Sequence, residues 1–309
     1  MDPAPRYSPR RPATSRFVTA RGLRHHLLEW GSPALASPER PTLVMLHGWM
    51  DVAASFQFVV DALPTDRHVI ALDWRGFGAT DSPPADTYFF AEYLGDLELV
   101  LDALFGVDRE PVDLLGHSMG GNVAMSYAGL RPERIRRLAN LEGFGLPETK
   151  PEQAPGRLVQ WLDELKAPSM LRSYDRVEAV ARRLMQNNPL LGADKAAWLA
   201  PHWSRQAEDG RWHLLGDPAH KRVNPVLFQK QEVLETWKLI SAPVLWVEGD
   251  LTDVQKWWGH RYPRSDFESR LAVVRKLHRQ VLSPCGHMLH HDQPGALAAA
   301  LAAFLSVAD

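Results

Sequence analysis

The sequence predicts an α/β protein with a doubly wound, mostly parallel, eight-stranded sheet. One observation predicts the sheet, and a second predicts an insertion in it. Short apolar runs of strand length alternate with longer segments whose apolar residues recur at helical spacing. That alternation stops between residues 143 and 240, where the apolar spacing is helical throughout. We therefore expect a core formed by residues 16–142 and 241–309, with residues 143–240 inserted as a helical cap, or lid, over the ends of the strands.

The first half of the core starts with a predicted β-hairpin over residues 16–30, because Gly22 marks a turn between two strand-like runs. Before it, residues 1–15 are rich in proline and arginine and are expected to form a disordered basic tail. The elements expected next are strands at 42–47, 68–72, 112–115 and 134–141, and helices at 53–63, 91–105 and 122–130.

The cap should contain three helices. Two are predicted by apolar residues spaced i, i+3, i+4, i+7, from Leu158 to Leu165 and from Val177 to Leu184, and residues 193–206 form the third. The core then resumes with strands at 243–247 and 279–283 and helices at 265–276 and 294–307. Tryptophans in the cap, and the pocket they could line, favour a mainly apolar substrate. The tryptophans concerned are Trp161, Trp198, Trp203 and Trp212.

Charge and cysteine content restrict the class of protein. The 309 residues carry a net charge of −2, so nothing favours binding to nucleic acid or to an anionic membrane. Cys285 is the one cysteine, which excludes a disulfide framework, and no apolar run is long enough to span a bilayer or to form a signal peptide. A cytoplasmic protein acting on a small molecule is expected, and the oligomeric state stays open.

The segment Gly116-His117-Ser118-Met119-Gly120 fits the pattern G-x-S-x-G between a predicted buried strand and a predicted helix. Strand, sharp turn and helix are the context of a nucleophile elbow. Small residues on either side let strand and helix approach closely while the turn exposes the Ser118 hydroxyl. The free N–H groups at the start of the helix favour developing negative charge.

Other reactive side chains follow later strands, at the edge where functional groups of an open α/β sheet gather. Glu142 follows one strand, Asp250 and Asp253 another, and His287 the last. Their order, serine then acid then histidine, is that of hydrolases with a Ser-His-acid triad. A histidine would take the proton of Ser118, and a carboxylate would fix its tautomer and stabilise the imidazolium.

Four stretches, in order, resemble the α/β-hydrolase superfamily, and the resemblance covers residues 17–305. They are Leu46-His47-Gly48-Trp49, the run from Asp73 to Asp81, Gly116 to Gly121, and Gly286-His287. Within the superfamily the chain looks most similar to the branch of serine-hydrolase-like proteins and of epoxide and haloalkane hydrolases. The latter enzymes use an aspartate as nucleophile. Ser118 departs from them, which favours hydrolysis of an ester or amide.

The resemblance also implies roles for other residues. The backbone N–H groups of Trp49 and Met119 would form the oxyanion hole, and His47 would support it without acting as a base. The usual acid lies after the seventh strand, three residues beyond a glycine, where this chain has Thr252. The branch with haloalkane dehalogenases places an alternative acid after the sixth strand. We favour Glu142 there as the acid, with Asp253 as the alternative.

Three hypotheses for the function follow. The first is a serine esterase acting through an acyl-enzyme without cofactor, with Ser118, His287 and Glu142 as its triad. The second is a non-catalytic binding protein on the same scaffold, and the third is a cofactor-free C–C hydrolase or perhydrolase. Arginines of the cap, if they face inward, would instead favour a carboxylate-bearing substrate. They are Arg157, Arg172, Arg182 and Arg183.

No pattern predicts a cofactor or a metal. Gly76 and Gly78 follow a strand, but Asp81 stands where a dinucleotide-binding loop needs glycine. His287, His290 and His291 lie close in sequence without a matching ligand set, so the last two are expected to have helix or loop roles. Cys285 is expected to be a buried thiol.

Overall fold

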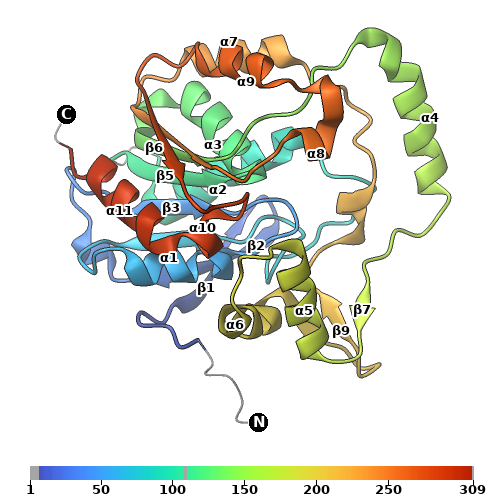
Figure 1. Cartoon of the computed structure of the whole chain (residues 1–309), viewed down its shortest axis with the longest axis horizontal. Helices are drawn as coiled ribbons and strands as arrows, with labels where there is room; N and C mark the ends of the chain where they lie inside the picture. The colour runs from blue at the N-terminus through green and yellow to red at the C-terminus, as the bar shows by residue number, and fades with distance from the viewer. Residues whose placement is uncertain (1–6, 108–109, 308–309) are drawn as a thin grey trace.

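A computed structural model describes residues 7–107 and 110–307, and its centre is a twisted eight-stranded sheet (Figure 1). The strands are ordered β1-β2-β4-β3-β5-β6-β10-β11, with β2 antiparallel to both neighbours and the others parallel. Their bounds are β1 Thr14–Ala20, β2 Leu23–Trp30, β3 Leu43–Leu46, β4 Val69–Leu72, β5 Val112–His117, β6 Ile135–Leu141, β10 Val244–Gly249 and β11 Leu277–Leu282. The predicted fold class is confirmed.

Helices cover both faces of the sheet and define two apolar cores. One face carries α1 (Gln57–Ala62), α10 (Leu289–Asp292) and α11 (Pro294–Leu305). The other carries α2 (Phe90–Phe105), α3 (Met119–Leu130), α7 (Lys230–Lys238) and α9 (Arg264–Leu271). Along β3, buried side chains alternate between the two cores, as expected for a strand covered on both sides. Within the described residues, no helix is long and apolar enough to cross a membrane.

Residues 143–243, between β6 and β10, form an insertion. It contains α4 (Ala154–Leu165), α5 (Val177–Asn187) and α6 (Ala193–Trp203), followed by α7. It also contains a three-stranded antiparallel sheet, which the sequence did not predict. Strands of two or three residues are too short to show alternation, and one of them replaces the predicted end of the third helix. They are β7 (Ser173–Tyr174), β8 (Ser204–Gln206) and β9 (Trp212–Leu214).

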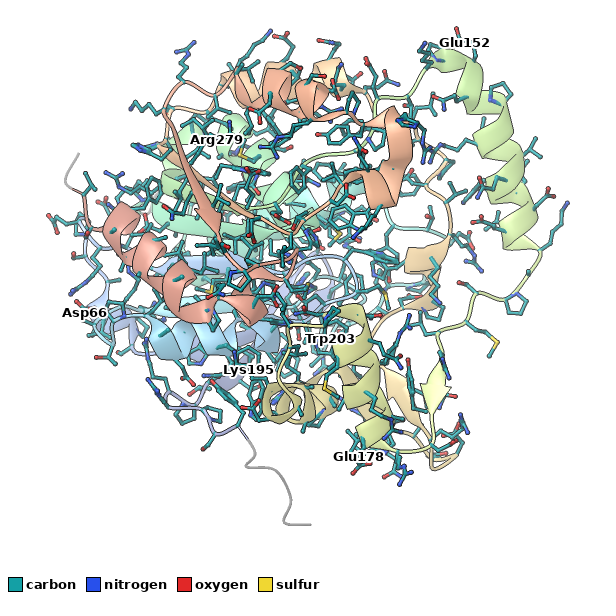
Figure 2. All side chains as sticks on the ribbon, viewed as in Figure 1. Asp66, Glu152, Glu178, Lys195, Trp203 and Arg279 are labelled. Atoms are coloured by element: carbon teal, nitrogen blue, oxygen red, sulfur yellow. The ribbon has the colours of Figure 1, made fainter. Side chains whose placement is uncertain are left out.

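The helices of the insertion are buried to different degrees. The apolar stripes of α5 and α6 pack together around Phe58, and α7 packs on α3 as part of the core. By contrast, α4 has no buried residue, and Leu158, Val159 and Leu162 are 46, 58 and 51% exposed. Figures 1 and 2 show α4 at the outer margin of the molecule, with Glu152 just before it.

Residues 214–220 of the insertion are fastened to the loop that follows β4. The Gly78 N–H donates to Leu215 O at 3.0 Å, and the Asp217 N–H donates to Gly76 O at 2.7 Å. The His220 ring lies between the rings of Phe77 and Tyr88, with centroids 3.8 and 3.6 Å away. This end of the insertion is therefore fixed to the core.

The prediction of a disordered tail over residues 1–15 is wrong for residues 7–15. The backbone N–H groups of Arg10 and Arg11 donate to the Asp61 carboxylate at 2.9 and 2.8 Å, and the Tyr7 hydroxyl donates to it as well. Asp61 lies on α1, so a single carboxylate there anchors the segment. Residues 1–6 lie outside the described residues.

Candidate active site

Ser118 lies at the tight turn between β5 and α3, with φ 51° and ψ −114°. This left-handed conformation is strained for a residue with a side chain and persists only where the surroundings impose it. Gly116 and Gly120 make the turn possible. A Cβ on Gly116 would lie 2.3 Å from Gly120 O, and a Cβ on Gly120 would lie 2.2 Å from Leu46 O. The predicted strand–turn–helix context of Ser118 is present.

Two backbone N–H groups near Ser118 have no hydrogen-bond partner within the described part of the chain. Met119 is the first residue of α3, and Trp49 lies in the turn that follows β3. The two turns approach closely, because a Cβ on Gly48 would lie 3.2 Å from the Ser118 Cβ. Free donors at a helix start and a nearby turn are the arrangement that binds an oxyanion.

His47 supports the turn that carries Trp49. Its Nε2 accepts the Trp74 backbone N–H at 3.0 Å, which leaves Nδ1 to donate to Gly48 O at 2.7 Å. Burial lowers the pKa of the imidazole. Both ring nitrogens are thus occupied, and the neutral ring holds the turn in place.

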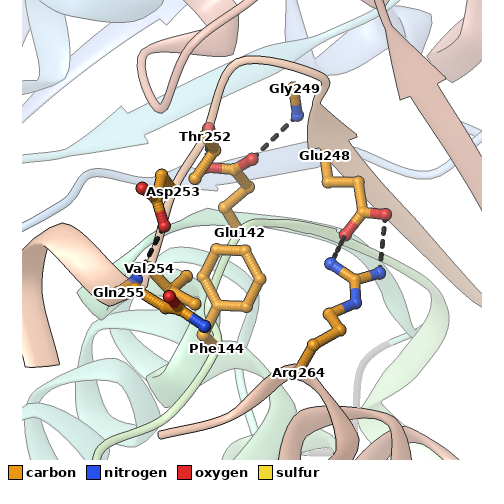
Figure 3. A pocket seen from close by; sticks show the side chains of 9 residues that line it. All are labelled: Glu142, Phe144, Glu248, Gly249, Thr252, Asp253, Val254, Gln255 and Arg264. Carbon is orange, nitrogen blue, oxygen red and sulfur yellow. Dashed lines mark hydrogen bonds and ion pairs between the residues drawn. The ribbon is translucent and has the colours of Figure 1, made fainter. Parts of the chain in front are cut away.

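Glu142 and His287 are brought together across the sheet edge. Glu142 directly follows β6, is 1% exposed and has φ 54°. Its Oε2 accepts from His287 Nδ1 at 2.6 Å and from the Thr252 hydroxyl at 3.0 Å, while Oε1 accepts the Gly249 N–H at 2.7 Å. Figure 3 shows Glu142 between Gly249 and Thr252. The carboxylate fixes the tautomer of His287, because Nδ1 must carry the proton and Nε2 is left as an acceptor.

The His287 loop is held beside the elbow. His117 Nε2 donates to the His287 backbone carbonyl at 2.8 Å, and the Trp257 ring packs edge-on against the His287 ring at 4.6 Å. Over residues 7–107 and 110–307, no hydrogen bond joins the Ser118 hydroxyl to His287. Contacts of this kind commonly tighten only when substrate binds.

The other carboxylates considered as acids lie elsewhere. Asp253 is exposed and accepts the Gln255 N–H at 3.0 Å, at the start of the short helix α8 (Gln255–Trp258). Asp250 accepts the Ser283 hydroxyl at 2.6 Å and the Cys285 N–H at 2.9 Å. Neither hydrogen-bonds His287, so of the predicted carboxylates the structure joins Glu142 alone to the histidine.

A buried cluster beneath the elbow was not found from the sequence. Asp51, His117 and His290 have ligand-type atoms within 4.8 Å of one another, the one such trio among the described residues. Burial opposes ionisation of Asp51, but His290, His291 and His47 outweigh it and hold the pKa of that carboxyl well below its usual range. The three members come from three distant segments, so no local motif could reveal them. Their donor atoms are of the type that binds transition metals.

The structure also shows the surroundings of Cys285 and of the arginines of the cap. Cys285 is buried, and burial raises the pKa of its thiol to about 12. Arg172, Arg182 and Arg183 are exposed, and Arg157 donates to the backbone O of Asn224 at 3.1 Å, so these arginines do not form an inward-facing cluster.

A cavity of about 10 Å³ lies between the turn after β3 and the insertion. It is lined by Met50, Asp51, Val52, Phe77, Trp203, Leu214 and Leu215.

Comparisons with known proteins identify the family of this fold. A family model described as "alpha/beta hydrolase fold" matches residues 41–294. A serine hydrolase-like protein of Danio rerio is 30% identical over 187 residues, and the match spans 59% of this chain and 55% of that protein, about half its length. Epoxide hydrolase A of Mycobacterium tuberculosis is 26% identical, covering 95% of this chain and 97% of that one. A solved thioesterase domain from the curacin biosynthetic pathway superposes with a TM-score of 0.79 at 26% identity, covering 94% and 98%.

Proposed function

This chain belongs to the α/β-hydrolase fold family, and we propose that it is a serine hydrolase that cleaves an ester-type bond of a small, mainly apolar substrate. The observation that carries the proposal is the joint placement of Ser118 on a strained turn and of Glu142 on His287 Nδ1 at 2.6 Å. The names of its relatives, a serine hydrolase-like protein, an epoxide hydrolase and a thioesterase domain, support hydrolysis as the reaction class. The serine favours acyl transfer over epoxide opening.

In the proposed mechanism the Ser118 hydroxyl attacks the substrate carbonyl while His287 Nε2 accepts its proton. The Glu142 carboxylate stabilises the imidazolium through Nδ1. The bond to the leaving alcohol then breaks, and His287 returns the proton to the alcohol oxygen. A water molecule then attacks the carbonyl of the acyl-enzyme and gives a proton to His287. The bond to Ser118 breaks, His287 returns the proton to Ser118 Oγ, and the carboxylic acid is released.

The tetrahedral intermediates carry a negative oxygen, for which the N–H groups of Met119 and Trp49 are the proposed donors. Both groups are free of protein partners within the described residues. Loss of one such donor costs about 10²–10³ in kcat in serine hydrolases. The same donors would serve a thioester, since the charge develops on the same atom.

Apolar surface in the insertion supports the proposed substrate preference. The small cavity between the turn after β3 and the insertion is lined mainly by apolar side chains, among them Met50 and Phe77 of the core and Trp203 of the insertion. Its volume of about 10 Å³ is that of about one water molecule, so a substrate would fit here only if the insertion moved. We therefore assign the insertion the role of a lid. The balanced charge and lone cysteine favour a cytoplasmic place of action.

The test is labelling by a fluorophosphonate together with hydrolysis of p-nitrophenyl esters. The wild-type protein is expected to be labelled once per chain, and Ser118→Ala should lose both labelling and esterase activity while keeping its melting temperature. A Ser118→Ala protein with full activity would overturn the proposal. Absence of labelling in the wild type, with no hydrolysis across esters and thioesters, would favour the non-catalytic alternative.

A further inference from the structure

The proposed acid is held from the neighbouring strand by a residue that carries no charge. Glu142 follows β6 and Thr252 follows β10, and these strands pair in parallel, with Leu141 opposite Val247. The Thr252 hydroxyl donates to Glu142 Oε2 at 3.0 Å. The same oxygen accepts from His287 Nδ1 at 2.6 Å. Thr252 therefore acts on the atom that contacts the histidine.

A buried glutamate needs such a contact more than a shorter acid would. Its side chain has three rotatable torsions, and Glu142 extends from a backbone with φ 54°. The Gly249 N–H fixes Oε1 at 2.7 Å, and within the described residues Oε2 is held by His287 Nδ1 and by the Thr252 hydroxyl. The Thr252 donor thus holds Oε2 independently of the histidine and stabilises the anion, since hydrogen bonds to charged groups are the stronger ones.

We infer that Thr252 is a positioning residue which holds Glu142 Oε2 on His287. The inference rests on the proposed serine-hydrolase function.

The positioning role is tested with Thr252→Val, which keeps the shape of the side chain and removes the donor. The expected kcat for a p-nitrophenyl ester falls about tenfold with KM unchanged. The acid limb of the kcat/KM profile should move to higher pH, because a carboxylate that loses a donor makes the Glu142–His287 pair bind its proton more tightly. Thr252→Ser should restore both values.

Ser283→Ala is the matched control, because it removes a hydroxyl that donates to Asp250, a carboxylate of the same edge that does not contact His287. It should leave kcat and the pH profile unchanged. A Thr252→Val protein indistinguishable from wild type, or a Thr252→Ser protein that fails to restore the acid limb, would overturn the positioning role.

Fluorophosphonate labelling of the wild type separates this inference from the proposed function. If the wild type is labelled and Thr252→Val behaves like it, the inference alone fails. If the wild type is not labelled, the proposed function itself fails.

Discussion

The edge of the sheet that carries the candidate site and helix α4 of the proposed lid are built in opposite ways. At the edge, Glu142 is 1% exposed and accepts three hydrogen bonds, and Ser118 is held on a strained turn by close backbone contacts. In α4 no residue is buried, and Leu158, Val159 and Leu162 are about half exposed. Groups whose positions the proposed chemistry depends on are therefore fixed by several contacts, whereas this helix of the proposed lid is loosely held.

The largest effect expected from this comparison concerns the two carboxylates of the edge. Glu142→Gln keeps the shape of the side chain but removes the charge that stabilises the imidazolium. The kcat should fall by about 10⁴, the loss known for the corresponding change in a serine protease triad. Asp253→Asn should stay near wild type, because Asp253 is exposed and bound only to the Gln255 N–H. Steady-state kinetics decide this, and the reverse ranking would show that the acid is misassigned.

The second effect separates the two parts of the insertion by stability. Leu199 on α6 is fully buried, so Leu199→Ala should lower the free energy of unfolding by about 2–5 kcal/mol. Leu162→Ala on α4, where the side chain is 51% exposed, should change it by less than about 0.5 kcal/mol. Urea denaturation measures both. Equal losses would mean that α4 is packed in solution and that the comparison is wrong.

The third effect is a dependence of stability on pH, caused by buried histidines near this edge of the sheet. Burial lowers the pKa of His47, His117 and His291, so these rings stay neutral in the folded protein. The unfolded chain then binds more protons as the pH falls below about 6.5, and the free energy of unfolding should decrease by up to about 1.4 kcal/mol per pH unit for each histidine.

His291→Leu tests this pH dependence, because neither ring nitrogen of His291 has a partner within the described residues. The variant loses no hydrogen bond and should show a shallower decline of stability between pH 7 and pH 5. An unchanged slope would show that His291 titrates normally when folded.

The smallest effect concerns substrate preference. Leu162→Asp should raise KM for a long-chain acyl ester about two- to fivefold, the loss of about 0.5–1 kcal/mol of apolar contact, without affecting the acetyl ester or the melting temperature. Leu130→Asp is the control, since Leu130 is 48% exposed at the end of α3. The same rise in KM for both variants would show that α4 does not contact the substrate.

Much of the fold was predictable because it depends on local patterns. The parallel strands are short apolar runs between turn residues, and the hairpin turn at Arg21-Gly22, with φ 50° and 76°, follows from glycine at a position that needs a left-handed conformation. The strand–turn–helix context of Ser118 was visible for the same reason. The preference for Glu142 over Asp253 needed the family resemblance, and the structure adds the hydrogen bond between Glu142 and His287.

What the sequence missed depends on which segments meet. The stripe on α4 and the stripe on α5 have the same spacing, yet Leu158 and Leu162 are exposed while Val180 and Leu184 are buried. Periodicity shows which side of a helix is apolar and says nothing about what covers it. The cluster of Asp51, His117 and His290 likewise exists only once three segments that are distant in sequence meet.

The exposure of α4 has a consequence for how such an enzyme diversifies. Most substitutions reduce stability by about 1 kcal/mol, and a domain has only about 5–15 kcal/mol in reserve. Substitutions in a helix with no buried residue cost the fold much less free energy than this average. Its twelve positions can accept many amino acids while the fold persists. A library randomised at Leu158, Val159 and Leu162 should therefore retain a high fraction of folded members and become the natural starting point for selecting new substrates.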